Sequence, residues 1–334
     1  MRRKKSTRAT SHNYFSETLR RQKYQIAGAH SAVKKCRWLH NSLVQGKPCF
    51  KERFYGIQSH RCLQMTPTLA CNLRCRFCWR THPEDLGASV HASDVTEIEE
   101  PQKIVEESIH AQRRMLSGYR SQVLKGVIDE QKYREALNPY HAAISLEGEP
   151  TLYRNLGGLL AEFKSCGFTA FLVTNGTQPA VLRSLDVEPT QLYLSLYAPD
   201  EEGFTSICNP LQKNLWAKVR EGLSALTSFS CPTVIRLTLA KGLNMVSPEK
   251  YGKIIAETEP TYVEAKAYMY VGYSRRRLRF EHMPQLHEVL EFSERISKET
   301  GYNIIDASPD SRVVLLSRLR KPKKLAARNA PNRA

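Results

Sequence analysis

The sequence lacks the apolar segments of membrane and secreted proteins. No stretch approaches the roughly 20 apolar residues of a transmembrane helix, and no apolar run of about 7–15 residues follows the charged N-terminus, as it would in a signal peptide. Together with a mean hydropathy of −0.46, these absences predict a cytoplasmic protein with no membrane partner. Because cytoplasmic thiols stay reduced, we do not expect its nine cysteines to form a disulfide framework.

Acidic residues are scarce at both ends of the chain. Residues 1–53 hold fourteen Lys and Arg and two acidic residues, and residues 311–334 hold eight Lys and Arg and no acidic residue. Because the whole chain has a net charge of +17, residues 54–310 have a net charge of −3. A slightly acidic body with two basic ends is typical of a protein that binds a polyanion. Nucleic acid is the expected polyanion, because binding of Lys and Arg to its phosphates releases condensed counterions. Two alternatives stay open, a transit peptide over residues 1–21 and a disordered tail over residues 321–328.

Candidate metal ligands are restricted to the cysteines, because the ten histidines form no H-x-x-H or H-E-x-x-H pattern. Six cysteines form two sets of three. The downstream set is a C-x3-C-x2-C run, and the upstream set has twelve residues between neighbours; the sets are Cys71, Cys75 and Cys78, and Cys36, Cys49 and Cys62. Since four thiolates normally close a 4Fe–4S cluster, each set predicts a cluster with one iron open to an exogenous molecule.

Zinc is the alternative to iron. Structural zinc sites favour paired C-x2–4-C units with four ligands in all, and neither set supplies these, but a non-enzymatic zinc protein that binds nucleic acid stays open. The remaining cysteines, Cys166, Cys208 and Cys231, have no ligand spacing and are interpreted as core thiols.

Strand and helix patterns alternate along the body of the chain. This alternation predicts an α/β fold with a parallel sheet, curled into a partial (β/α)6 TIM-like barrel with functional groups at the strand C-termini. The polar residues 121–139 predict an insertion. The expected strands are Leu63–Thr66, Ala142–Leu146, Thr169–Val173, Gln191–Leu196, Thr233–Leu239 and Tyr262–Met269, and the expected helices are Ile98–Met115, Leu156–Ser165, Gln178–Leu185 and Leu211–Ser228.

Polar residues gather where these strands end. Residues 145–150 read Ser-Leu-Glu-Gly-Glu-Pro, residues 174–177 read Thr-Asn-Gly-Thr, and the last two strands carry Arg236, Glu264 and Lys266. Polar groups at the C-terminal ends of barrel strands predict a ligand site.

The C-x3-C-x-aromatic-C loop, with Phe77 as its aromatic residue, resembles the radical S-adenosylmethionine (radical SAM) superfamily over about residues 63–270. The upstream cysteines narrow the resemblance. They lie in the stretches Lys-Pro-Cys-Phe-Lys-Glu-Arg-Phe-Tyr-Gly-Ile (47–57) and Ser-His-Arg-Cys-Leu-Gln-Met-Thr-Pro (59–67). With twelve residues between neighbours, this set resembles the tRNA 4-demethylwyosine synthase family, and that resemblance covers nearly the whole chain except the tails.

The resemblance implies a tRNA-modifying enzyme of the carbon–carbon lyase class with two 4Fe–4S clusters and S-adenosyl-L-methionine (SAM). Reductive cleavage of SAM would give a 5′-deoxyadenosyl radical, which would take hydrogen from the methyl group of N1-methylguanosine next to the anticodon of tRNA-Phe. Pyruvate would supply two carbons of the new wyosine ring. Because only 35 residues precede Cys36, we expect the stand-alone archaeal form, a monomer that uses a separate electron donor such as a ferredoxin or flavodoxin.

The resemblance also assigns residue roles. The downstream cysteines would hold the SAM-binding cluster, and the upstream cysteines a second cluster that could chelate pyruvate. Lys51 would form an imine with pyruvate, which requires an amine with a lowered pKa, and Lys47 and Lys266 are its rivals. The residues expected to bind SAM are Glu147, Gly148 and Glu149, where the family usually has Gly-Gly-Glu, together with Asn175 and Ser195.

RNA contact is expected from the arginine-rich segment after the last strand. Arginines flanked by aromatic residues can hold phosphates and stack an exposed base, although such a run can also be a solvated face. The candidates are Arg275, Arg276, Arg277 and Arg279, beside Tyr273 and Phe280. We expect the target base to be extruded from its stack.

Three regions are expected, a cluster-binding basic extension (1–60), the barrel (61–275), and a C-terminal helical extension with a basic tail (276–334). The alternative function is that of another radical SAM enzyme with an auxiliary cluster, acting on a different RNA or on a peptide.

Overall fold

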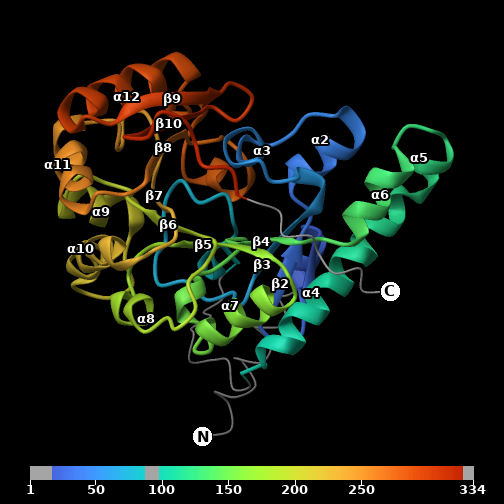
Figure 1. Cartoon of the computed structure of the whole chain (residues 1–334). Helices are drawn as coiled ribbons and strands as arrows, with labels where there is room; N and C mark the ends of the chain where they lie inside the picture. Colours follow the sequence, from blue (N-terminus) through green and yellow to red (C-terminus); the bar gives the residue numbers. More distant parts are fainter. Residues whose placement is uncertain (1–16, 87–97, 326–334) are drawn as a thin grey trace, which may run out of the picture.

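The structure is a computed structural model that describes residues 17–86 and 98–325. One ten-stranded sheet runs through these residues, in the order β1 to β8 and then β10-β9 (Figure 1). The strands are β1 Tyr24–Ala27, β2 Ser31–Lys34, β3 Cys62–Thr66, β4 His141–Ile144, β5 Thr169–Thr174, β6 Gln191–Ser195, β7 Thr233–Leu239, β8 Tyr262–Ala267, β9 Asn303–Ser308 and β10 Val313–Ser317.

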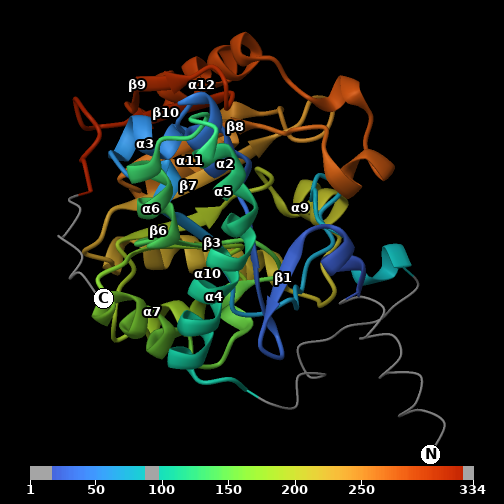
Figure 2. The same cartoon turned by 90° about the vertical axis from the view of Figure 1, so that its right-hand side faces the viewer.

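The strands β3 to β8 are parallel, so the expected partial (β/α)6 barrel is confirmed. Helices surround the outer face of this curl (Figures 1 and 2), and none in the described ranges is long and apolar enough to cross a membrane. The helices are α2 Arg37–Gln45, α3 Phe50–Tyr55, α4 Pro101–Leu116, α5 Arg120–Leu124, α6 Glu130–Leu137, α7 Leu156–Ser165, α8 Pro179–Arg183, α9 Glu201–Cys208, α10 Leu215–Ser224, α11 Pro248–Thr258 and α12 Leu286–Thr300.

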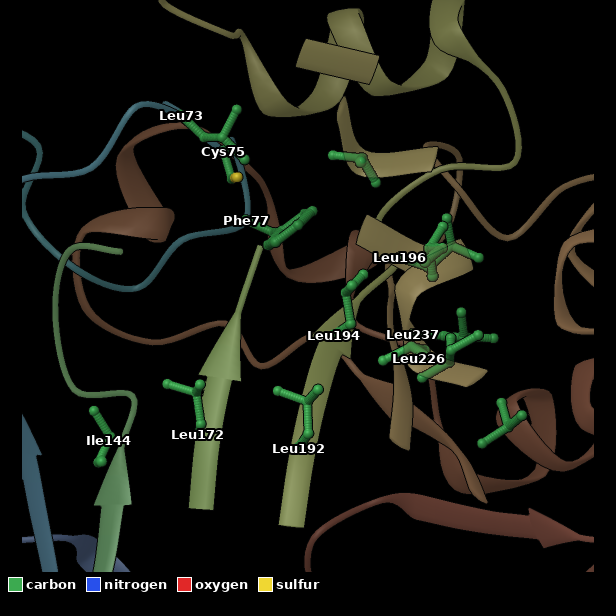
Figure 3. Packing of buried hydrophobic residues seen from close by; sticks show 14 of the residues in the cluster. Leu73, Cys75, Phe77, Ile144, Leu172, Leu192, Leu194, Leu196, Leu226 and Leu237 are labelled. Carbon is green, nitrogen blue, oxygen red and sulfur yellow. The ribbon is translucent and has the colours of Figure 1, made fainter. Parts of the chain in front are cut away.

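Each parallel strand presents apolar side chains to two different partners, as alternation along a strand requires. Phe171 and Tyr193 face the inside of the curl, where they pack against Phe54 of α3. Their neighbours Leu172 and Leu192 belong instead to the main apolar cluster that the outer helices cover (Figure 3). The short helix α3 therefore fills the inside of the barrel.

Some expected bounds were wrong. The helix expected over residues 211–228 starts only at Leu215, because Asn214 has a φ of 60° and cannot continue a right-handed helix backwards. The last parallel strand ends at Ala267 rather than at residue 269. The polar insertion 121–139 folds into α5 and α6, whose apolar side chains form one cluster with those of α2.

The antiparallel strands at both edges were not expected. The hairpin β1–β2 pairs with β3 through Ala32 opposite Thr66, and β10 pairs with β8. The C-terminal extension is consequently not only helical, because β9 and β10 follow α12. The sheet crosses both expected region boundaries, at residues 60 and 275, and those boundaries stay predictions.

A disordered tail over residues 321–328 was left open as an alternative, and Lys324 and Leu325 of this segment contact α3. The Leu325 amide donates to Tyr55 O at 2.8 Å, and the Lys324 ammonium donates to Arg53 O at 2.7 Å. The Gly56 amide caps α3 at Glu52 O, and the tail supplies donors to two of the later carbonyls, which a helix end leaves without intrahelical partners. Residues 1–16 and 326–334 of the two basic ends lie outside the described residues.

We predict that deleting residues 322–334 loosens α3. The deletion removes the tail's hydrogen bonds to Arg53 and Tyr55, which lowers the local opening free energy by on the order of 1–2 kcal/mol. Hydrogen–deuterium exchange should then accelerate in residues 50–55 and stay unchanged in α7. Deleting only residues 326–334 retains both contacts and is the matched control; equal exchange in the two truncated proteins would contradict the prediction.

Candidate functional site

The downstream cysteines lie at the C-terminal ends of the parallel strands, as expected for a barrel site. They line one cavity of about 300 Å³ together with every residue expected to bind SAM. The lining includes Cys71, Cys75, Cys78, Glu147, Gly148, Glu149, Asn175 and Ser195. Residues from four separate segments of the sequence thus meet at this cavity.

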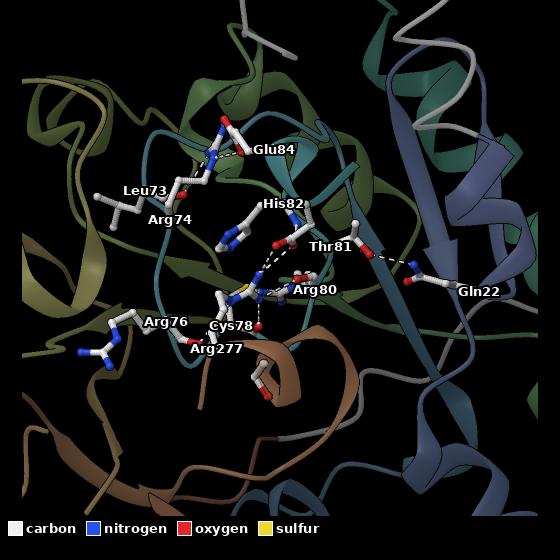
Figure 4. A network of polar contacts seen from close by, with 12 residues as sticks. Gln22, Leu73, Arg74, Arg76, Cys78, Arg80, Thr81, His82, Glu84 and Arg277 are labelled. Atoms are coloured by element: carbon white, nitrogen blue, oxygen red, sulfur yellow. Dashed lines mark hydrogen bonds and ion pairs between the residues drawn. The ribbon is translucent and has the colours of Figure 1, made fainter. Parts of the chain in front are cut away.

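The cysteine loop, residues 71–80, is irregular backbone held by side chains and by α9. The amides of Arg74 and Arg76 donate to the carbonyls of Cys208 and Ile207 at 2.8 and 2.9 Å. The Arg74 guanidinium donates to Cys71 O at 2.8 Å and pairs with Glu84 (Figure 4). Cys75 and Phe77 extend into the apolar cluster beneath the loop (Figure 3).

Gly148 and Glu149 bring the end of β4 against the cysteine loop. Gly148 has a φ of 61°, and a Cβ there would lie 2.4 Å from Thr68 O and 2.5 Å from Ala70 O, so the site requires glycine. The Glu149 carboxylate accepts from the Thr174 hydroxyl at 2.6 Å and the Asn175 amide at 2.7 Å. Glu149 therefore ties the ends of β4 and β5 together, and burial raises its pKa.

Glu147 replaces the usual glycine of the motif and is a buried carboxylate. It accepts from the Tyr24 hydroxyl at 3.0 Å, and burial raises its pKa to about 7. Arg80 donates to the carbonyls of Ser145 and Leu146 and lies 4.0 Å from Cys78 Sγ. Tyr24 and Arg80 were missed by the sequence analysis; only the position of Arg80, two residues after Cys78, could have indicated it.

The upstream cysteines come together around α3. Cys36 precedes α2, Cys49 precedes α3, and Cys62 begins β3. Burial, with the neighbouring thiols of Cys36 and Cys49, raises the pKa of Cys62, so the three sulfurs share one environment. The helical insertion α5–α6 packs beside Cys36.

The donors of both sets are thiols, the ligand type of iron–sulfur clusters. In the described part of the chain, no three His, Cys, Asp or Glu side chains converge as they would on one metal ion, and the four-ligand geometry of structural zinc is not formed there. A 4Fe–4S cluster instead takes one thiolate on each of several irons, which allows wider spacing of the sulfurs.

Two lysines and an ion pair adjoin the upstream cysteines. The Lys51 Nζ lies 4.2 Å from the Phe171 ring centroid and 4.4 Å from that of Tyr193. Arg236 pairs with the buried Glu264 at 2.6 Å. Burial, and then the charge of Arg236, lowers the pKa of Lys51 to about 8.

The two rivals of Lys51 differ in their surroundings. Burial and Arg236 also lower the pKa of Lys266 to about 8, and Lys266 lines the 300 Å³ cavity whereas Lys51 lies beneath it, on the ring of Phe171. Lys47 is exposed, so nothing desolvates its ammonium. The structure therefore brings together Lys51 and Lys266 and separates Lys47 from them.

The arginine-rich segment divides into two groups. Arg275, Arg276 and Arg279 are exposed, and none forms an ion pair with a described residue. Arg277 instead points inward and donates to Asp85 and to carbonyls of the cysteine loop (Figure 4). An RNA-binding role for Arg277 loses its support, because its guanidinium is already occupied.

Known families match both halves of this arrangement. The radical SAM superfamily matches residues 65–253, and a family described as wyosine base formation matches residues 257–318. The S-adenosyl-L-methionine-dependent tRNA 4-demethylwyosine synthase of Pyrococcus horikoshii is 48% identical over 308 residues, which cover 91% of this chain and 88% of that protein. The synthase of Methanocaldococcus jannaschii is 40% identical, over 89% of this chain and 94% of that protein.

Two solved structures share the fold across nearly the whole chain. "Structure of TYW1 with a lysine-pyruvate adduct bound" has a TM-score of 0.82 at 36% identity and covers 93% of this chain and 98% of its own. "Crystal structure of archaeal TYW1" has a TM-score of 0.76 at 33% identity, with 93% and 99% covered.

We predict that Gly148→Ala is more destabilising than Gly126→Ala. Both glycines have positive φ, 61° and 69°, but a Cβ on Gly126 would meet nothing within 4 Å. Left-handed strain costs each variant about 1–2 kcal/mol, and the clash with Thr68 and Ala70 adds roughly 1–3 kcal/mol to Gly148→Ala alone. Thermal unfolding should show the lower midpoint for Gly148→Ala; equal midpoints would mean that the two carbonyls move aside freely.

Proposed function

The chain belongs to the radical SAM superfamily and, within it, to the tRNA 4-demethylwyosine synthase family, and we propose that it converts N1-methylguanosine next to the anticodon of tRNA-Phe to 4-demethylwyosine, with pyruvate as the two-carbon donor. The observation that carries this proposal is that one cavity is lined both by the downstream cysteines and by Lys266, whose neighbours include Cys36 and Cys49 of the upstream set. Carbon–carbon bond formation here requires both a radical source and a site for a second reactant. The downstream set would provide the radical source, and the upstream set would provide the site for the second reactant.

The SAM site follows from membership in the superfamily, which implies SAM and one 4Fe–4S cluster. When bound, these cofactors supply a 5′-deoxyadenosyl radical. The thiols of Cys71, Cys75 and Cys78 would hold the cluster. Glu147, Asn175 and Ser195 face the same cavity and offer acceptors and donors for the amino, carboxylate and ribose groups of SAM, while Glu149 keeps the two strand ends in register.

The second cluster, on Cys36, Cys49 and Cys62, is part of the same proposal. Its support is the shared environment of the three thiols and the cationic side chains beside them. Arg236 and Lys266 line the cavity above this set, and two cations favour the binding of a carboxylate such as that of pyruvate. The carboxylate would thus be oriented between the second set and the SAM site.

Lys51 is proposed to bind pyruvate covalently. Its neutral amine attacks the keto carbon, the carbonyl oxygen leaves as water, and an imine remains. Later attack by the exocyclic amine of guanine displaces the lysine and closes the third ring. Burial, and then the charge of Arg236, lowers the pKa of Lys51 to about 8, which supports this role because imine formation requires a neutral amine. A related protein was solved with a lysine-pyruvate adduct bound.

Three further features stay proposals: a separate electron donor of the ferredoxin or flavodoxin type, a monomeric state, and a cytoplasmic location. RNA contact is proposed for Arg275, Arg276 and Arg279, whose exposed guanidinium groups can hold phosphates.

The proposed function is tested by incubating the anaerobically reconstituted protein with SAM, pyruvate, a reductant and tRNA that contains N1-methylguanosine. Nucleoside mass analysis should find 4-demethylwyosine, and labelled pyruvate should leave two labelled carbons in the tRNA. Cleavage of SAM without incorporation of pyruvate carbon, under conditions where the tRNA binds, would indicate a radical SAM enzyme with another substrate.

We predict different defects for the two cysteine sets. Cys75→Ala should abolish formation of 5′-deoxyadenosine, because Cys75 belongs to the SAM-binding loop. Cys49→Ala should retain much of that cleavage and lose the tricyclic product. Liquid chromatography of both products, with iron content measured in each variant, provides the comparison. Equal loss of both products from Cys49→Ala, in a protein that retains its first cluster, would contradict two independent sites.

We predict that Lys51→Arg stops product formation without weakening tRNA binding, since it retains the positive charge and cannot form the imine. Borohydride reduction in the presence of pyruvate, followed by peptide mass mapping, should place the adduct on Lys51. Lys266→Arg is the matched control, because Lys266 has the same lowered pKa. An adduct on Lys266 would transfer the role to that residue, and no adduct under turnover conditions would refute the imine.

A further inference from the structure

The arginine-rich segment, residues 272–279, contacts the cysteine loop on one side and is exposed on the other. It begins with a 3-10 helix, Gly272–Arg276. Ser274 and Leu278 are buried, whereas Arg275, Arg276 and Arg279 are exposed. Nothing in the proposed chemistry uses its inward-pointing member, Arg277.

The inner side of the segment is a set of contacts from Arg277 to the cysteine loop. Its side chain is 16% exposed and pairs with Asp85 at 2.7 Å. The same guanidinium donates to the carbonyls of Arg76 at 3.3 Å, Arg80 at 3.1 Å and Cys78 (Figure 4). A planar guanidinium can serve a carboxylate and several carbonyls at once, which a lysine ammonium cannot.

Backbone contacts reinforce the Arg277 contacts. The Tyr273 amide donates to Trp79 O at 2.9 Å. Gly272 has a φ of 59°, and a Cβ there would lie 2.2 Å from Trp79 O, so only glycine permits this approach. The carbonyls of residues 76, 78, 79 and 80, which surround the ligand Cys78, therefore all accept hydrogen bonds from residues 272–277.

The outer side of the segment has the composition of a surface that binds single-stranded RNA. The Arg275 guanidinium lies 5.4 Å from the Tyr270 ring centroid, and Arg276 lies 4.6 Å from that of Tyr273. Phe280 is 56% exposed and meets the Tyr270 ring edge-on at 5.9 Å. Tyr270 and Tyr273 are half-buried, and aromatic rings flanked by arginines can stack a base and hold a phosphate.

We propose that Arg277 is a positioning residue that couples RNA bound on the outer side of residues 272–279 to the geometry of the cysteine loop. The proposal rests on the proposed function, because it takes tRNA as the ligand of the outer side. Arg277 directly follows Arg276, the last residue of the 3-10 helix, and caps that helix, so a ligand that fixes Arg276 also restricts Arg277 and the carbonyls that it contacts.

The coupling has two physical consequences. RNA that orders residues 272–279 also restricts the cysteine loop, and the entropy cost of that ordering is then included in RNA binding. SAM subsequently binds a loop that has less conformational entropy left to lose. Hydrogen bonds and charge around cluster cysteines also set the electronic properties of a cluster, and Arg277 contributes both. By linkage, any effect of RNA on SAM binding must appear equally as an effect of SAM on RNA binding.

The test measures the loop rather than turnover alone. Hydrogen–deuterium exchange is followed in residues 71–80 of the reconstituted protein, with and without tRNA that contains N1-methylguanosine. We expect tRNA to slow exchange in the wild-type loop, and SAM to tighten tRNA binding about fivefold or more, the lower end of typical coupling between sites. In Arg277→Gln, tRNA should still bind, but loop protection and the SAM effect should both disappear.

Three companion variants make the result specific. Arg183→Gln, on α8 away from the site, should behave as the wild type in every measurement. Arg275→Gln should weaken tRNA binding and leave loop exchange without tRNA unchanged. Asp85→Asn weakens the ion pair with Arg277 without altering Arg277 itself, and it should reduce the coupling. This variant replaces Arg277→Gln if Arg277→Gln loses cluster iron.

The outcomes separate the inference from the proposed function. Tight tRNA binding and product formation in the wild type, without loop protection, would overturn the coupling and leave the function standing. Full protection retained in Arg277→Gln and in Asp85→Asn would overturn the role of Arg277. Failure of the wild type to bind or modify tRNA would overturn the proposed function, and the inference with it.

Discussion

The arrangement of the site depends on satisfying the backbone of the cysteine loop. Residues 71–80 form neither helix nor strand, yet the loop is largely buried, and buried carbonyls require donors. Arg74 supplies them from within the loop, at Cys71 O and Leu73 O, and Arg277 supplies them from the C-terminal segment. The end of α9 provides acceptors for the loop amides. The position of each sulfur is consequently set by groups far away in the sequence.

A second constraint is the charge inside the barrel. Lys51, Lys266 and Arg236 surround one buried carboxylate, Glu264, which also accepts from the Tyr55 hydroxyl at 2.8 Å. Three cations against one anion is an unfavourable balance in a desolvated space, and the lowered pKa of each lysine relieves it. Thiolates at Cys36, Cys49 and Cys62 would add negative charge to the same space. Deprotonation of these thiols and deprotonation of the lysines would each reduce the excess of positive charge.

The central strands could be predicted because parallel strands are continuous apolar runs, and the cysteine spacings predicted the loop. Tyr24 could not be assigned to the site, since β1 is four residues long and its partner Glu147 lies 123 residues away. Lys51 was chosen over Lys266 from the resemblance, and that choice stays a prediction, because burial lowers the pKa of both lysines to about 8. Arg80 was missed, and Arg277 was assigned to RNA contact with the arginines around it, because the partners of each guanidinium come from distant segments of the chain.

Arg277 shows how local geometry separates residues that composition treats alike. A 3-10 helix has about three residues per turn, so positions i and i+3 lie on one side. Ser274 and Arg277 share the inner side by this rule, and Arg275 and Arg276 fall outside. One extra residue between Ser274 and Arg276 would move Arg277 out of the inner position and bring Arg276 there, where the distances to Asp85 and to the loop carbonyls would differ. The register of this turn, rather than the number of arginines, therefore determines which guanidinium holds the loop and which ones remain exposed.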